Sequence, residues 1–209
     1  MGQFGWEMTK EDSVLDFARV VQLGLAIGPA DMSKGFEVKR ILVKPSSFTI
    51  TDDATKFHGI THDYACQHGT PLAQALMEFF QVVEAAYKDG GRLCAHHIEF
   101  DAGIILSELR TCGLDEQAAK WQRMARQGFC TMNSTLGRWV LTQAGEQVQE
   151  NETARHFLGL AKISRMLQVP ECEVLLAQHH DAGTDAKLTS LVYASLLRQH
   201  AQRSEGASP

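Results

Sequence analysis

The feature that most constrains the fold is a pair of apolar segments separated by a short turn. From Val21 to Ile27, every second residue is apolar, which is the pattern of a strand with one buried face. Residues 28–35 are rich in turn-forming residues, and residues 36–45 have the composition of a second strand. We therefore predict a β-hairpin near the start of the chain.

Helical periodicity and one short strand pattern follow the hairpin. The clearest helix has Thr70 as its expected N-cap, Pro71 in its first turn and Gly90 as its stop. Its predicted buried stripe comprises Leu72, Leu76, Phe80, Val83 and Tyr87. Residues 92–95 are predicted as a short buried strand. Further helices are predicted at about residues 101–110, 115–127, 157–169 and 181–197. This order of elements indicates an α/β domain with a mixed β-sheet.

The length and composition fit a single globular domain. The chain has 209 residues, of which 44% are apolar and 22% are charged. We expect the folded domain to cover residues 1–197. The polar composition of residues 198–209 predicts a disordered C-terminal tail.

The sequence also bears on cellular location and on charge. We find no signal peptide and no membrane span, and the five cysteines lack C-x-x-C spacing. These features predict an intracellular protein of the cytoplasm or the nucleus. The net charge of −5 neither indicates nor excludes nucleic-acid binding. The basic residues Lys120, Arg123 and Arg126 recur at helical spacing. They could form a face that binds nucleic acid, but we favour a solvated helix face.

Titratable residues follow the short strand at residues 92–95. His96, His97 and Asp101 come directly after it, and an open α/β sheet builds its sites at such strand ends. This position makes the three residues candidates for a functional site. The alternative is an ordinary polar loop after a strand.

A second candidate lies at the start of the last predicted helix. Asp185 follows His180 and falls on the same stripe as Leu188 and Val192. A carboxylate on a core-facing stripe is costly to bury unless it is paired or binds a metal. The alternative is an acidic residue that the positive end of the helix dipole favours.

Three segments occur in the order found in a known family. They are residues 58–61 (HGIT), 95–101 (AHHIEFD) and 180–186 (HDAGTDA). The chain resembles the DEDDh 3′–5′ exonucleases, whose second motif is H-N-x-x-F-D and whose third is H-x-A-x-x-D-A. The second motif is matched with His97 in place of the asparagine, and the third is matched throughout. The resemblance implies a ribonuclease-H-like fold, which is a mixed β-sheet flanked by α-helices.

The first motif of that family, F-D-x-E-T-T-G, is where this chain departs from the pattern. Phe4, Glu7 and Thr9 match it, but Gly5 occupies the place of the aspartate. Because four residues precede Gly5, one expectation is a truncated first strand. The alternative is a start site further upstream.

The resemblance also implies a mechanism and a set of site residues. It implies two divalent ions, Mg²⁺ or Mn²⁺, and the single-stranded 3′ end of DNA or RNA as substrate. Glu7 and Asp185 hold the ion that activates the attacking water, and Asp101 supports the cluster through water. His180 is the general base, because a histidine has its ordinary pKa near the working pH. The expected substrate-binding residues are Thr9, His58, His96 and His97.

Several alternatives stay open at this point. The leading hypothesis is a 3′–5′ exonuclease whose activity Gly5 impairs, and the second is an inactive relative that binds nucleic acid or a protein partner. An unrelated metal hydrolase built from His96, His97 and His180 ranks last, because these residues lack metal-ligand spacing. For His58, the alternative to substrate binding is that its side chain fixes a turn.

Overall fold

The computed structural model describes residues 18–132, 159–178 and 180–206. The strands are β1 (Gln22–Ile27), β2 (Glu37–Lys44), β3 (Thr70–Pro71), β4 (Cys94–Ala95) and β5 (Phe129–Cys130). The helices are α2 (Asp52–His58), α3 (His62–His68), α4 (Leu72–Lys88), α5 (Ile98–Thr111), α6 (Asp115–Arg126), α8 (Leu160–Met166), α9 (Cys172–Leu176) and α10 (Ala182–Gly206). None of the helices in these described ranges combines the length and the apolar character that a membrane span needs.

The strands form two small sheets. In the first sheet, β1 and β2 are antiparallel, with Gly24 opposite Arg40, and β3 pairs in parallel with β2 at Val43. In the second sheet, β4 and β5 are parallel, with Cys94 opposite Phe129. The hairpin and the mixed arrangement of strands that the sequence predicted are confirmed.

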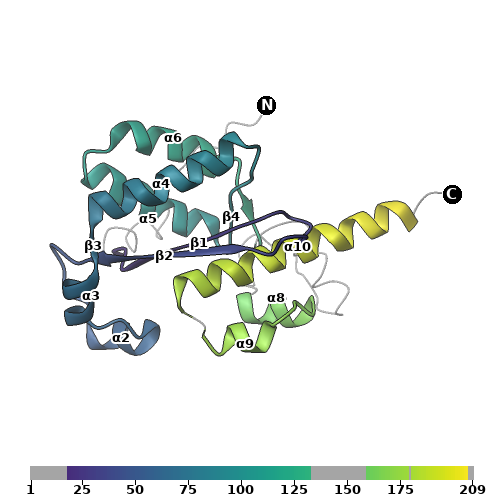
Figure 1. Ribbon diagram of the computed structural model, residues 1–209, viewed down its shortest axis with the longest axis horizontal. Coiled ribbons are helices and arrows are strands. Elements are labelled where there is room, and N and C mark those ends of the chain that lie inside the picture. The colour runs from purple at the N-terminus through teal and green to yellow at the C-terminus, as the bar shows by residue number, and fades with distance from the viewer. Residues whose placement is uncertain (1–17, 133–158, 179, 207–209) are drawn as a thin grey trace, which may run out of the picture.

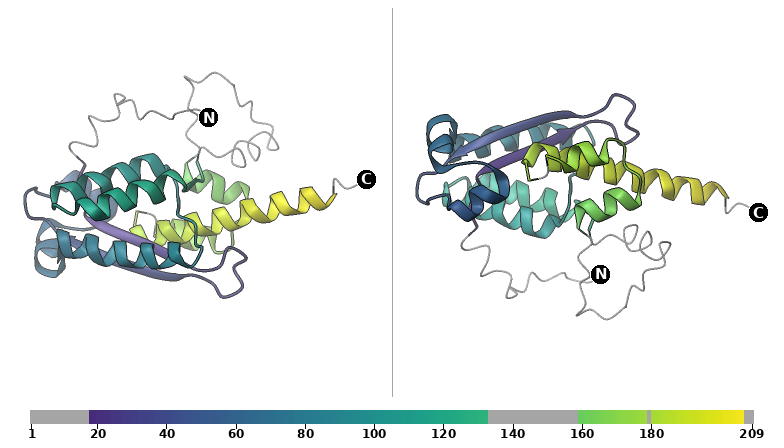
Figure 2. Two further views of the ribbon diagram at one scale, coloured as in Figure 1. Left: turned by 90° about the horizontal axis from the view of Figure 1, so that it is seen from above. Right: turned by 90° about the horizontal axis from the view of Figure 1, so that it is seen from below.

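Helices cover the hairpin on two sides (Figure 1). On one side, α4, α5 and α6 pack their apolar residues against β1 and β2 to form the larger core. On the other side, α8, α9 and α10 enclose a second apolar cluster centred on α10. Views from above and below show α10 running along the hairpin, with its last turns extending beyond the other elements (Figure 2). The hairpin is therefore the layer between two cores.

Two helices begin at other residues than the sequence predicted. Thr70 does not cap α4, because it pairs with β2 as part of β3, and the helix starts after Pro71. Helix α5 starts at Ile98 instead of Asp101. The reason is that His97 turns the chain in a left-handed conformation, with φ of 75°.

The last helix is longer than the sequence predicted. It continues to Gly206, where a disordered tail was expected from residue 198. Arginine, glutamine and alanine, which dominate residues 198–203, are good helix formers. The helix is already packed through Leu188 and Leu196 in the second core, so these polar residues extend it.

Helices α2, α3 and α9 were not predicted, because each is too short to show an amphipathic stripe. Threonine caps hold the first two: Thr51 Oγ1 accepts a hydrogen bond from the Ala54 N–H, and Thr61 Oγ1 accepts one from the Tyr64 N–H, both at 3.2 Å. Gly59, in a left-handed conformation, ends α2. The caps were visible in the sequence as threonines followed by acidic residues.

Candidate active site

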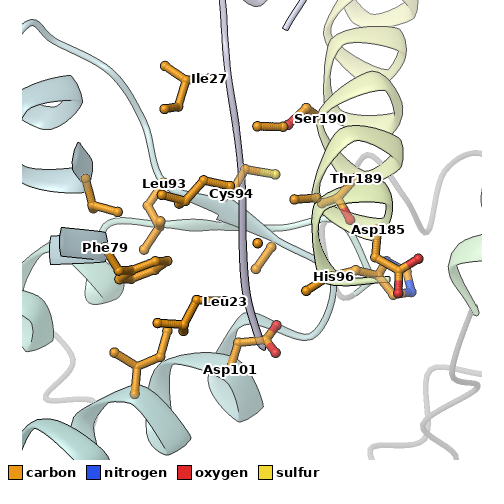
Figure 3. Close-up of a pocket in the computed structure, with 18 of the residues that line it drawn as sticks. Leu23, Ile27, Phe79, Leu93, Cys94, His96, Asp101, Asp185, Thr189 and Ser190 are labelled. Atoms are coloured by element: carbon orange, nitrogen blue, oxygen red, sulfur yellow. The ribbon is translucent and has the colours of Figure 1, made fainter. Parts of the chain in front are cut away.

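A cavity of about 1300 Å³ lies between β1 and β4 (Figure 3). Residues of α4 and α5 form one wall, and residues of α10 form another. Within the described residues, β1 has one strand partner, β2, and β4 has one, β5, so the cavity separates the two sheets. Leu93 and Phe79 are among its apolar lining, whereas His96, Asp101 and Asp185 supply polar groups (Figure 3).

Asp101 stands in the first turn of α5 and lines the cavity. His97 turns the chain after β4, and its carbonyl oxygen accepts hydrogen bonds from the N–H groups of Phe100 and Asp101, at 3.0 and 3.4 Å. The residue is partly exposed, and it lies in the lining of the cavity. Burial of its carboxyl group, and secondly the charge of Asp185, raise the pKa of Asp101 to about 7. The two carboxyl groups therefore interact electrostatically.

Asp185 and His180 belong to the start of α10. Asp185 lies in the first turn of the helix, and His180 precedes the helix with φ of 75°. The backbone N–H of His180 donates to Asp185 Oδ2 at 3.3 Å. The ring of His180 lies against Phe57 of α2, with 3.8 Å between the ring centroids. Both residues line the same cavity as Asp101.

The two histidines of the second motif have different surroundings. His96 lines the cavity, and its Nδ1 lies 2.8 Å from Thr131 Oγ1, which joins β4 to the end of β5. His97 is stacked on Phe100, with 5.7 Å between the ring centroids. Unlike His96, His97 is not among the described residues that line the cavity.

His58 makes the contact expected of a residue that fixes a turn. Its Nδ1 accepts a hydrogen bond from the Ile60 N–H at 3.1 Å, and burial lowers its pKa. His58 also lines the cavity, so the structure brings it to the same place as the acids. Glu7 and Thr9, like Gly5, lie outside the described residues.

Comparison with models of protein families assigns the chain to a family. A model of the RNase T family, described as an exonuclease, matches residues 4–193. The chain belongs to the RNase T exonuclease family. No curated protein matches the sequence at a significant level. The mixed α/β structure is that of a ribonuclease-H-like exonuclease, and membership of the RNase T family indicates a nuclease, which is a hydrolase with a nucleic-acid substrate.

The two acids of this RNase T family member fit a divalent ion as part of a ligand set. Carboxylate oxygens are the ligands that Mg²⁺ and Mn²⁺ prefer. Across the ranges that the structure describes, however, no three side chains of His, Cys, Asp or Glu are grouped so as to hold an ion. Asp101 and Asp185 would therefore need a further ligand. The expected one is Glu7, which lies outside those ranges.

Two residues beside the site were not predicted from the sequence. Phe57 is 65% exposed although its ring lies against His180, and Thr131 is fully buried against His96. Each contact joins elements that are far apart in the chain. Neither spacing nor composition could therefore have identified them.

The basic residues of α6 were considered as a binding face. Lys120 forms ion pairs with Glu84 of α4 at 3.1 Å and with Glu116 at 2.9 Å. Its charge is thus compensated by neighbouring carboxylates. For Lys120, this arrangement supports the solvated helix face that we favoured over a binding face.

Proposed function

We propose that this member of the RNase T family is a DEDDh-type 3′–5′ exonuclease that hydrolyses phosphodiester bonds at the 3′ end of single-stranded DNA or RNA. The observation that carries the proposal is the cavity shared by Asp101 and Asp185, whose carboxyl groups interact electrostatically. Asp101 belongs to the second motif and Asp185 to the third. The fold thus joins the two motifs that the sequence matches.

The described residues suggest a division of labour. Asp101 and Asp185, with Glu7, would hold divalent ions, Mg²⁺ or Mn²⁺, which stabilise negative charge on phosphate oxygens when bound. His180 accepts a proton from the attacking water. The water oxygen bonds to phosphorus, the bond from phosphorus to the leaving 3′ oxygen breaks, and that oxygen takes a proton from solvent. The residues proposed to bind the substrate are Thr9, His58, His96 and His97.

Gly5 argues for reduced activity. In the DEDDh resemblance this position carries an aspartate that would serve as a metal ligand, and glycine has no side chain that could coordinate a metal. Losing such a carboxylate would cost on the order of a thousandfold in rate. This substitution supports a second candidate function, an inactive relative that binds nucleic acid or a protein partner.

The experiment that tests the proposal uses 5′-labelled single strands of DNA and RNA. With Mg²⁺ or Mn²⁺ we expect shortening from the 3′ end, and EDTA should protect both strands. The Asp185→Asn variant, purified in parallel, controls for a contaminating nuclease. Degradation that survives complete chelation, or that is equal in the variant, contradicts the proposal. Binding of the strands without degradation supports the inactive relative.

The proposed role of Gly5 is tested by restoring the carboxylate. Gly5→Asp should raise the affinity for Mn²⁺ and the rate of hydrolysis together, because the restored carboxylate would serve as a metal ligand. We expect a gain of about tenfold or more in rate. If the variant exceeds the unmodified protein in neither measurement, Gly5 is not the missing ligand position.

A further inference from the structure

The first turn of α10 is fixed to the hairpin by side chains of β1 and β2. Arg40 of β2 donates from Nε to Asp181 Oδ1 at 2.7 Å and from Nη2 to Thr184 Oγ1 at 3.2 Å. Gln22 of β1 accepts from the Ala182 N–H at 2.8 Å and donates to Asp181 Oδ2 at 3.3 Å. The two strands thus hold the turn through charged and amide groups.

Asp181 is the centre of these contacts. Besides Arg40 and Gln22, it accepts from the Thr184 N–H at 2.8 Å and from the Thr184 hydroxyl at 2.9 Å, as an N-cap residue does. Burial on its own would raise the pKa of Asp181, but the hydrogen bonds from Thr184 and Arg40 together lower it. The carboxylate therefore stays ionised and bonded at both oxygens.

Two glycines let the helix approach the hairpin closely. A Cβ added at Gly24 of β1 would lie 2.0 Å from the carbonyl oxygen of Ala182. A Cβ added at Gly183 would lie 2.7 Å from Cγ of Arg40. Larger residues at either position would push the turn away from the strands, so the contacts above depend on this close packing.

We infer that Arg40, Gln22 and Asp181 are positioning residues for the nuclease site. Asp181 follows His180 directly and lies one helical turn before Asp185. Holding Asp181 therefore fixes the backbone on which the proposed general base and the proposed metal ligand are carried. The residues between His180 and Asp185 thus have a role of their own. This inference rests on the proposed function, because the three residues act only by positioning His180 and Asp185, whose roles are part of that proposal.

The test compares Arg40→Gln with Lys39→Gln. Lys39 is the preceding residue of β2 and points to the opposite face of the strand. Its side chain is 41% exposed, against 43% for Arg40, and it pairs with Glu37 as Arg40 pairs with Asp181. Each variant removes one half-exposed cation of the same strand, so Lys39→Gln is a matched control.

We expect Arg40→Gln to lower kcat for a single-stranded oligonucleotide at least tenfold, with KM changed less than twofold. Amide hydrogen exchange in residues 182–188 should become at least tenfold faster, while the thermal midpoint stays within a few degrees. Lys39→Gln should change none of these quantities. Arg40→Lys, which keeps the charge but loses the forked contact, should restore kcat in part.

Equal kcat and equal exchange rates in Arg40→Gln and Lys39→Gln would overturn the inference. A rise in KM without a fall in kcat would also overturn the inference, because that pattern marks the loss of a substrate contact. If the unmodified protein hydrolyses no strand, that failure belongs to the proposed function. The exchange rates then decide alone, and equal protection in the two variants overturns the positioning role.

A double variant checks that Arg40 acts through Asp181. Asp181→Asn keeps a capping side chain but removes the charge that Arg40 contacts. If both substitutions break the same contact, Arg40→Gln combined with Asp181→Asn should lose no more kcat than the larger single loss. Losses that multiply would show that Arg40 acts by another route.

Discussion

The two halves of the candidate site are held in different ways. Asp185 starts a helix that polar side chains fix to the hairpin, through Arg40 and Asp181. The first turn of the helix that carries Asp101 is fixed mainly by packing: Ala102 is buried, and its carbonyl oxygen accepts a hydrogen bond from Trp121 Nε1 at 3.0 Å. The comparison teaches that the first turn beside one acid depends on a polar network and the first turn beside the other depends on the core.

The electrostatic settings of the two acids also differ. The pKa of Asp101 is raised to about 7 by burial and by the charge of Asp185, whereas the carboxylate of Asp185 accepts a backbone hydrogen bond from His180. Near neutral pH, a divalent ion held by the two proposed ligands would have to compete with a proton at Asp101. We expect the two acids to contribute unequally to function and to stability.

The largest difference should appear when each acid is removed. Asp185→Asn should lower metal-dependent hydrolysis by about a thousandfold, because this residue is proposed to hold the ion that activates water. Asp101→Asn should cost about a hundredfold, because its proposed support acts through water. Single-turnover rates in saturating Mn²⁺ measure both. A greater loss in Asp101→Asn would reverse the proposed division of labour.

The same contrast explains what the sequence could and could not predict. The stripe of α4 and the alternation of β1 are local patterns, so Leu76 and Leu23 were placed in the core correctly. The motifs singled out Asp101 and Asp185, and both residues line the same cavity. The contact between Arg40 and Asp181 joins residues that are 141 positions apart, and no periodicity marks such a pair. Packing follows patterns, whereas polar networks depend on the finished fold.

A smaller difference in stability should separate two ion pairs, one beside α5 and one between α8 and α9. Arg19 donates to both carboxylate oxygens of Glu108 in α5, at 2.7 and 3.1 Å, and the Glu108 side chain is 4% exposed. Arg19→Ala leaves that carboxylate buried without its cation, so the free energy of unfolding should fall by about 3 kcal/mol. Arg165 and Glu173 are 55% and 70% exposed, so Arg165→Ala should cost less than about 1 kcal/mol.

Denaturation with urea at neutral pH measures both losses. The slope of the transition should be the same in both variants, because neither changes the surface exposed on unfolding. Equal losses would mean that the Glu108 carboxylate is not held in the core as the structure describes.

The smallest expected effect is the pH dependence that Asp101 gives to stability in the presence of EDTA. The folded carboxyl has a pKa of about 7, above its ordinary value of 3.8. Below the ordinary value the group is protonated in both states, and above pH 7 it is ionised in both. The free energy of unfolding should therefore rise as the pH falls from about 7 towards 4. Asp101→Asn removes this dependence, so the variant should exceed the unmodified protein by about 1 kcal/mol at pH 8, an amount limited by solvent screening of a partly exposed group.

Urea denaturation of the two proteins at pH 8 and pH 5 checks the sign. The stability advantage of Asp101→Asn should shrink at pH 5, because the unmodified carboxyl is then protonated in the folded state. Asp53→Asn is the matched control, since the Asp53 side chain is 92% exposed on α2, and its effect should be small at both values. An advantage of Asp101→Asn that grows on acidification would show that the folded protein favours the charged form. In that case burial does not govern Asp101, and the contrast with Asp185 would have to come from hydrogen bonding alone.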